Sequence, residues 1–216
     1  MNEQCSGLQV KCMPVNPIEM NLYLVYEKNG EGVLIDPGCC FPDEFERLFQ
    51  FVAHENIRLK HVLLTHPHFD HFWGAARICR HYGLPLQMHA KAVDLMERAS
   101  LGAVSFGLEA VENPPHTEAF TSNRIEWAGH TLEIRYTPGH SEGSVCYVIP
   151  EIQTVFSGDV LFNGSIGRTD LPTGDLDLLR KSIFEQLFVL DENYTVRPGH
   201  GGRTTIGYER YHNPFL

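Results

Sequence analysis

Three histidines and one aspartate lie within a stretch of six residues, as His66, His68, Asp70 and His71. They follow the apolar run 61–64, which predicts a short buried strand. Because alternate side chains of an extended backbone point to the same face, His66 and His68 are placed to bind one metal ion together. Asp70 and His71 come where the chain turns into a helix and can reach a second point nearby. Imidazole and carboxylate are ligands for zinc and iron, so the pattern predicts a metal site rather than a histidine-rich polar loop.

Three further side chains of the same types follow along the chain. His140 and His200 each lie in a glycine-bearing turn after a predicted strand, and Asp159 ends another predicted strand. A strand gives such a residue a rigid position, and small neighbours let the backbone come close to a bound group. A single histidine in a turn is usually a surface residue. The order His, Asp, His after the 66–71 motif makes these three residues candidates for the same site.

The 66–71 motif, followed by these residues in this order, resembles the metallo-β-lactamase superfamily over nearly the whole chain. The resemblance implies two divalent metal ions, with zinc expected before iron or manganese. By this likeness the first metal is bound by His66, His68 and His140, the second by Asp70, His71 and His200, and Asp159 bridges them. Asp36, at the end of a predicted strand, is implied to hold the histidine loop by hydrogen bonds, which is support that metal ligands generally need.

The resemblance also implies a reaction. A pair of metals about 3.5–4 Å apart lowers the pKa of a shared water, so that a metal-bridged hydroxide is available near neutral pH. One metal would polarise the substrate carbonyl and the other would meet the leaving group. Asp70 is expected to be catalytic as well, by orienting the hydroxide. No serine or cysteine nucleophile is required.

The segment 167–170, with the sequence GRTD, and the ending 203–216 resemble the short, single-domain glyoxalase II-like hydrolases. This likeness implies a small-molecule thioester substrate such as S-lactoylglutathione. In full-length glyoxalase II a C-terminal helical domain supplies much of the glutathione-binding surface, and the sequence ends about where that domain would start. We therefore expect this protein to share thioester hydrolysis with glyoxalase II, and its specificity for glutathione to be less well implied. Arg168 and Asp170 are candidate pocket residues, with mutual pairing that stiffens their loop as the alternative role.

Two other functions stay open at this point. The 167–170 segment is also similar to the persulfide dioxygenases, for which His66, His140 and Asp159 would supply the two histidines and one carboxylate that hold a single iron. The other alternative is a non-catalytic metal-binding module. The complete ligand set argues against it, because an inert module has no need for both sites.

Strands and helices alternate along the chain and must position these residues. The strands are predicted at 8–11, 21–26, 32–35, 61–64, 86–88, 125–127, 131–136, 145–149, 155–157 and 195–196, and the helices at 43–55, 72–82, 91–99 and 175–188. Together with the resemblance, this order predicts an α/β (α+β) fold, a four-layer αββα sandwich that forms one domain over residues 1–216. The segment 100–122 is irregular yet apolar, and either a lid or pocket wall or packing against its own domain would explain it.

Composition limits the classes of partner that the protein is expected to bind. The 216 residues are 43% hydrophobic and carry a net charge of −10, which disfavours nucleic acid and hence a nuclease. No apolar stretch is long enough to span a bilayer, and the N-terminus lacks a secretion signal. The six cysteines show no disulfide framework, so reduced thiols in the cytoplasm are expected. We expect a monomer or a small homo-oligomer with no membrane partner.

Overall fold

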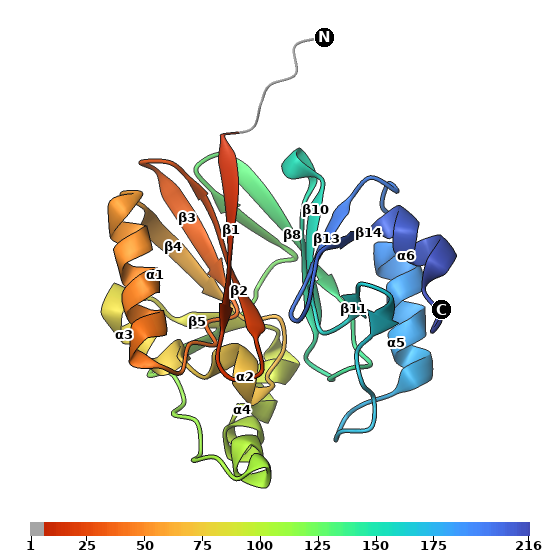
Figure 1. Ribbon diagram of the computed structural model, residues 1–216, viewed down its shortest axis with the longest axis horizontal. Helices are drawn as coiled ribbons and strands as arrows, with labels where there is room; N and C mark the ends of the chain where they lie inside the picture. Colours follow the sequence, from red (N-terminus) through yellow and green to blue (C-terminus); the bar gives the residue numbers. More distant parts are fainter. Residues whose placement is uncertain (1–6) are drawn as a thin grey trace.

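The computed structural model describes residues 7–216, apart from the side chains of Glu97, Ser105 and Phe106. Two six-stranded sheets face each other, and helices α1 and α3 cover the outer side of one sheet while α5 and α6 cover the outer side of the other (Figure 1). The short helix α2 and the helix α4 lie at one end of the sandwich, below both sheets in this view. The predicted αββα architecture is confirmed.

The first sheet joins an antiparallel part to a parallel part. Its strands, in spatial order, are β1 (Leu8–Val15), β2 (Met20–Glu27), β3 (Glu31–Ile35), β4 (Arg58–Leu63), β5 (Leu86–Met88) and β6 (Thr117–Ala119). The first three pair antiparallel through tight turns, and the last three are added parallel. Parallel strands need long crossovers. The helices that supply them are α1 (Pro42–His54), α2 (Phe69–Phe72), α3 (Ala75–Tyr82) and α4 (Ala90–Gly102), the last extended by the 3-10 turn η1 (Ala103–Phe106).

The second sheet is built from the second half of the chain. Its strands, in spatial order, are β14 (Thr204–Thr205), β13 (Thr195–Pro198), β10 (Thr154–Gly158), β9 (Val145–Ile149), β8 (His130–Tyr136) and β7 (Arg124–Trp127). The remaining elements are the turn η2 (Pro150–Ile152), the hairpin β11 (Leu161–Phe162) and β12 (Ser165–Ile166), helix α5 (Leu176–Ser182), which continues as the π-helical turn η3 (Ile183–Leu187), and helix α6 (Ile206–His212).

The alternation of side chains along β2 explains why this strand is apolar on both faces. Tyr23 and Val25 pack between the sheets, in a cluster that also contains Tyr147 and Phe156 of the second sheet. Leu22 and Leu24 point the other way and pack under the helices. A strand covered on both faces is expected to be a continuous apolar run, as this one is. The two sheets are therefore joined by a shared core.

Several element predictions needed correction. The helix predicted over 72–82 is interrupted at Trp73 and Gly74, between α2 and α3. The Gly74 N–H donates to the Pro37 carbonyl oxygen at 2.9 Å instead of continuing the helical pattern, and a Cβ at Gly74 would lie 2.5 Å from the Cys39 carbonyl oxygen. The helix predicted over 91–99 extends to Gly102. The helix predicted over 175–188 ends at Ser182 and continues as the π-helical turn η3. The three-residue strand β5 was predicted at 86–88, but the other strands of two or three residues and α6 were not, since elements this short show little usable periodicity.

The irregular segment 100–122 packs mainly against its own domain. Ala103 and Val111 are buried in the cluster under the helices, and Phe120 packs on the cluster between the sheets. Val104 and Leu108 are exposed. Among the described side chains and backbone of this segment, only Gly102 lines the cavity described below.

No helix within residues 7–216 is long and apolar enough to cross a bilayer. The cysteines at 12, 39, 40, 79 and 146 are unpaired, and Cys5 lies outside the described residues.

A histidine with two carboxylates joins the sheets at the end of the sandwich away from α4. His130 Nδ1 lies 2.6 Å from a Glu151 oxygen, and its Nε2 lies 3.1 Å from a Glu27 oxygen on β2. Burial by itself would lower the pKa of His130, but the hydrogen bond with Glu151 and the nearby Glu27 carboxylate outweigh it and raise that pKa. A raised folded-state pKa adds stability that is complete below the unfolded-state pKa and is lost as pH rises through the folded-state value.

We therefore expect His130→Gln to lower the melting temperature more at about pH 6 than at about pH 9, because only the lower pH keeps the imidazolium in the wild type. Thermal unfolding of both proteins at the two pH values measures this. His212→Gln, at an exposed site on α6, is the matched control. A wild-type-minus-variant difference that is the same at both pH values would contradict the expectation.

Candidate metal centre

The histidine loop runs from the end of β4 into α2 and is held by the second sheet. Val145 of β9 donates its backbone N–H to the Thr65 carbonyl oxygen at 2.9 Å. The Tyr147 hydroxyl donates to the Leu64 carbonyl oxygen at 2.5 Å. Both bonds come from the neighbouring sheet, so the loop lies where the ends of the two sheets meet. Residues from both halves of the chain can therefore reach it.

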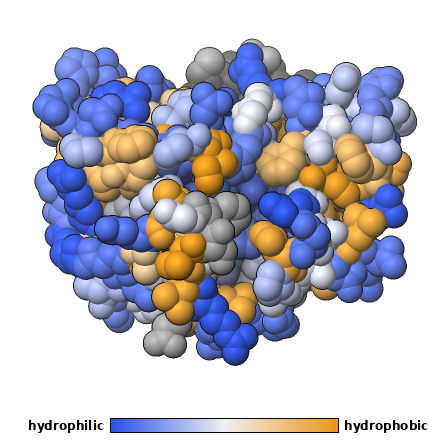
Figure 2. All heavy atoms as spheres, turned by 60° about the horizontal axis from the view of Figure 1, so that its bottom comes forward, coloured by the Kyte–Doolittle hydropathy of each residue, from blue (hydrophilic) through white to orange (hydrophobic). Residues whose placement is uncertain are grey.

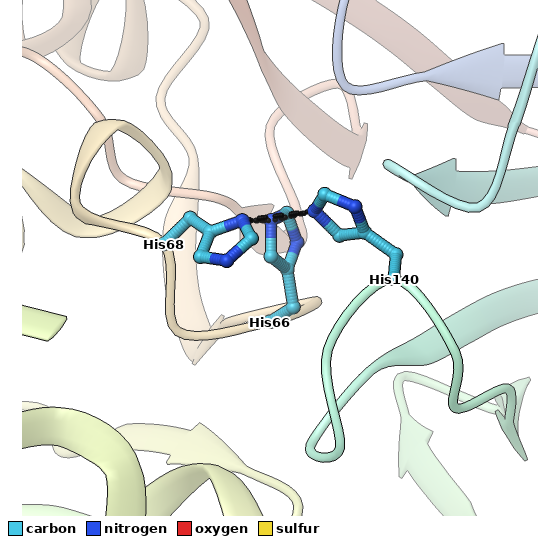
Figure 3. Close-up of side chains that lie close together, drawn as sticks. All are labelled: His66, His68 and His140. Atoms are coloured by element: carbon cyan, nitrogen blue, oxygen red, sulfur yellow. Dashed lines mark hydrogen bonds between the residues drawn. The ribbon is translucent and has the colours of Figure 1, made fainter. Parts of the chain in front are cut away.

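His66, His68 and His140 form the first group of ligand candidates. Figure 3 shows their three rings facing one another, with His140 reaching across from a separate loop. His140 Nε2 lies 3.2 Å from His66 Nε2 and 2.8 Å from His68 Nδ1, and the latter two nitrogens are 3.1 Å apart. Three nitrogens bound at about 2.0–2.1 Å around a tetrahedral metal would lie about 3.3 Å from one another. The spacing of this group therefore fits one metal ion.

Electrostatics keep these three imidazoles neutral. Burial, followed by the neighbouring imidazoles, lowers the pKa of His66 well below its ordinary value. The same causes lower the pKa of His68 to about 3, and burial also lowers the pKa of His140. A neutral imidazole has a free lone pair, which is the form that binds a metal.

Asp70, His71 and His200 form the second group. His200 Nε2 lies 3.1 Å from Asp70 Oδ2, and His71 Nε2 lies 3.7 Å from the same oxygen. Asp159 stands between the groups, with Oδ1 at 3.3 Å from His71 Nε2 and Oδ2 at 3.7 Å from both His140 and His200 Nε2. One carboxylate therefore faces ligand nitrogens of both groups.

Two atoms at the meeting point of the groups have no hydrogen-bond partner within the described part of the chain. His71 Nε2 and Asp159 Oδ1 are both fully buried. Buried polar atoms are almost always paired, so a pair of unsatisfied ones at one point fits a position that binds an ion. Although burial opposes its charge, Asp159, followed by Asp36 and Asp70, raises the pKa of His71 well above its ordinary value. The negative potential of these carboxylates favours a cation here, and the donor set fits divalent metals.

In His71 and His140 a hydrogen bond at Nδ1 orients the ring so that Nε2 faces the site. His71 Nδ1 donates to Asp36 Oδ2 at 2.9 Å, and His140 Nδ1 donates to the Arg168 carbonyl oxygen at 2.8 Å. Asp36 also accepts from the Thr65 backbone N–H at 2.7 Å and from the Thr65 hydroxyl at 2.8 Å. Asp36 thus ties the start of the histidine loop to His71, as the supporting role requires. Such bonds fix the tautomer that leaves Nε2 free for metal.

The turn that carries His200 is held by two polar side chains of β2. Asn21 Nδ2 donates to the carbonyl oxygens of Pro198 and Gly201, at 3.1 and 2.9 Å, and the Tyr23 hydroxyl donates to the Pro198 oxygen at 2.8 Å. The turn also passes very close to the ligands. A Cβ at Gly199 would lie 2.3 Å from Asp159 Oδ1 and 2.6 Å from the His71 ring, so only glycine fits there.

Sequence reasoning missed three side chains that support the site, namely Asn16, Asn21 and Tyr23. Asn16 Nδ2 donates to the carbonyl oxygens of Gly38 and Asp70, at 3.1 and 3.0 Å, and so holds the backbone of a ligand candidate. For Asn21 a signal was present, because an asparagine inside an otherwise apolar strand must find buried partners. For the other two, nothing in the local pattern indicated the contact.

Arg168 and Asp170 pair with each other. Arg168 Nε and Nη2 donate to the two Asp170 oxygens, at 2.8 and 2.7 Å, and both side chains are largely exposed. Among the described residues, Arg168 lines the cavity and Asp170 does not. The pair lies in the loop whose Arg168 carbonyl oxygen accepts a hydrogen bond from His140.

A cavity of about 670 Å³ opens onto both ligand groups. Five of the seven ligand candidates are at its surface, and these are His68, Asp70, His140, Asp159 and His200. Its size is within the range of cavities that bury small-molecule ligands.

We expect Asp36→Asn to weaken metal binding about 10–100-fold, the usual effect of losing a residue that orients a ligand. An amide nitrogen in place of Oδ2 would face the His71 Nδ1–H, and the ring would then place its proton on Nε2. Asparagine tolerates the positive φ of 56° at this position, so the fold should be kept. Titration against a competing chelator measures the affinity, with the exposed carboxylate variant Asp94→Asn as the control. Equal affinities in wild type and Asp36→Asn would contradict the role.

Comparisons with known proteins identify a family and a similar protein of nearly the same length. Residues 17–200 match the family described as the metallo-beta-lactamase superfamily. A Haemophilus influenzae protein named hydroxyacylglutathione hydrolase GloC is 35% identical over 218 residues, which cover 97% of this chain and 98% of that protein.

Two solved structures are similar throughout. The structure of TTHA1623 in a di-iron-bound form has a TM-score of 0.84 at 38% identity and covers 95% of this chain and 100% of its own. The structure of the BLEG-1 B3 metallo-beta-lactamase has a TM-score of 0.85 at 35% identity and covers 96% of this chain and 99% of its own.

Proposed function

Because the chain belongs to the metallo-β-lactamase superfamily and is a metal-dependent hydrolase, we propose that it is a binuclear enzyme that cleaves a small-molecule thioester, with S-lactoylglutathione as the first candidate. The observation that carries this proposal is the position of Asp159 between two ligand groups at the base of one cavity. The name of the Haemophilus influenzae relative supports the choice of substrate.

In this proposal the seven ligand candidates hold two metal ions. His66, His68 and His140 would hold one metal ion, Asp70, His71 and His200 a second, and Asp159 would contact both. When bound, such metals activate a water molecule and polarise the carbonyl that it attacks.

Asp70 orients the attacking water in this proposal. Its Oδ2 faces His200, and within the described residues no hydrogen bond occupies its Oδ1. Although burial would raise the pKa of Asp70, His71 and the bond from His200 lower it, so Asp70 is an ionised acceptor at neutral pH. A carboxylate with one free oxygen at the cavity surface can accept a proton from the water and hold it at Oδ1. The leaving thiolate needs no acid from the protein, since thiolates are weak bases.

A panel of thioesters tests the proposal. Metal-replete protein should release thiol from at least one thioester, and elemental analysis of the same preparation should find about two metal ions per chain. The proposal includes a cytoplasmic monomer or small homo-oligomer that acts on neither nucleic acid nor membrane. Protein that carries its metals but releases thiol from no member of the panel would overturn the proposed function.

A persulfide dioxygenase is the second candidate, because a 38% identical relative is known in a di-iron-bound form and iron is the metal that such chemistry needs. Oxygen uptake with glutathione persulfide separates the two functions. A β-lactam belongs in the same panel, since another relative is titled a metallo-beta-lactamase. Turnover of any substrate removes the non-catalytic alternative.

A further inference from the structure

Helix α4 presents one face to the cavity above the ligand groups. The residues of this helix that line the cavity are Leu95, Arg98, Ala99 and Gly102. Their spacing of three, one and three positions places them on a single stripe of an α-helix. Arg98 is exposed, so its guanidinium can stay in water while its methylene stem covers the stripe. The surface that this stripe presents to the cavity is therefore apolar, apart from the guanidinium of Arg98.

The rest of the wall is apolar as well. The side chains that complete it come from both halves of the chain and are Ile18, Pro67, Phe69, Phe162, Ile166, Leu171 and Pro172. Figure 2 looks onto this end of the molecule and shows hydrophobic side chains, in orange, gathered around the middle of the face. Exposed apolar surface around a cavity in a hydrolase indicates what the cavity takes up.

The wall offers few polar groups to a substrate. Apart from the ligand candidates and Arg98, its polar side chains are Ser141, Thr173 and Arg168. Arg168 is already paired through two hydrogen bonds with Asp170. A strongly polar group placed along this wall would lose its hydration without gaining hydrogen bonds in return, which is unfavourable.

Resting on the proposed function, we propose that the substrate is a thioester with a long apolar acyl group, which lies along the α4 stripe. Common biological thiols are polar, so the apolar part of a thioester is in general its acyl group. A lactoyl group would leave most of a 670 Å³ cavity unfilled. Each methylene that is buried should raise kcat/KM about three- to fourfold until the cavity is full.

Gly102→Leu is the variant that tests the stripe with the least risk to the fold. Gly102 has helical backbone angles, with φ at −56°, and among the described parts of the chain no atom lies within 4 Å of an added Cβ. A larger side chain therefore enters open space and narrows the cavity without straining the backbone. The neighbouring Leu101→Phe adds bulk outside the cavity, at a position that is 62% exposed, and serves as the matched control.

The experiment measures kcat/KM for acyl-glutathione thioesters from acetyl to octanoyl with the metal-replete enzyme. We expect a rise with chain length in the wild type and in Leu101→Phe. In Gly102→Leu we expect kcat/KM for the octanoyl thioester to fall about tenfold or more while that for the acetyl thioester is kept. Each methylene that can no longer be buried lowers kcat/KM about three- to fourfold, and these factors multiply. A flat profile in the wild type, or an equal loss at every chain length in Gly102→Leu, would overturn the inference.

A binding measurement separates this inference from the proposed function. S-alkylglutathione thioethers cannot be hydrolysed, and calorimetry gives their dissociation constants. Affinity that rises with alkyl length in the wild type and not in Gly102→Leu supports the apolar subsite even if no thioester is cleaved. Affinity that is independent of alkyl length rejects the subsite even if S-lactoylglutathione is cleaved.

Discussion

Replacement of Asp159 by alanine is expected to reduce thioester kcat/KM by about 10²–10³-fold or more and to lower the metal content from about two ions per chain towards one. Asp159 is buried between the two ligand groups, and it is the one described carboxylate that lies within 4 Å of both His71 and His140. In the proposed centre, its loss would remove a ligand from both groups at once. Steady-state kinetics and elemental analysis of the same preparation measure the two effects together.

Asp177→Ala is the control for this experiment, since Asp177 is exposed in the first turn of α5. It should keep both activity and metal. An Asp159→Ala protein that is folded, holds two metals and turns over thioester at the wild-type rate would contradict the assignment of Asp159 as the shared ligand.

The second large effect is expected for Asp70→Asn, which should lower kcat about 10²–10⁴-fold, the range for removal of a group that accepts a proton in the reaction. The amide keeps the shape of the side chain but cannot take up a proton. Asp70 is not in the first ligand group, so the metal held by His66, His68 and His140 should remain.

Asp70→Ala removes the oxygen atoms altogether and should be at least as damaging. Metal analysis of both variants shows whether the loss comes from chemistry or from an empty second position. Thioester turnover that is unchanged in Asp70→Ala would mean that water is activated elsewhere.

The seven ligand candidates could be predicted because residue type and chain order carry the information. His66 and His68 are two residues apart on an extended segment, and their shared direction follows from backbone geometry. The approach of His140, Asp159 and His200 to that loop was implied by the resemblance to a family, not by any local pattern. The structure brings all seven together in the three overlapping groups that could hold a metal ion.

The supporting contacts were harder to predict, because they join residues that are distant in the chain. Asn21 and Pro198 are 177 positions apart, and Asn16 and Asp70 are 54 positions apart. Nothing in either neighbourhood indicates the partner. The α4 stripe shows the same limit. Its helical spacing is visible in the sequence, but an apolar stripe on a helix usually faces the core, and here it faces a cavity.

The fold was predictable to the extent that its elements are long. Strands such as β2, with side chains buried on both faces, show the expected apolar run. The two-residue strands β11, β12 and β14 exist only because neighbouring segments pair with them, and no sequence pattern of that length is informative. At the break between α2 and α3, Gly74 lies against the Cys39 backbone, a contact made across 35 positions of the chain.

The central claim is that two metal ions are bound side by side and share Asp159. An anomalous difference map from a crystal of zinc-loaded protein, collected at the zinc edge, tests it most directly. The account predicts two peaks about 3.5–4 Å apart, one among His66, His68 and His140 and one among Asp70, His71 and His200. A map with no peak at these groups, or with one peak that Asp159 does not touch, would contradict it.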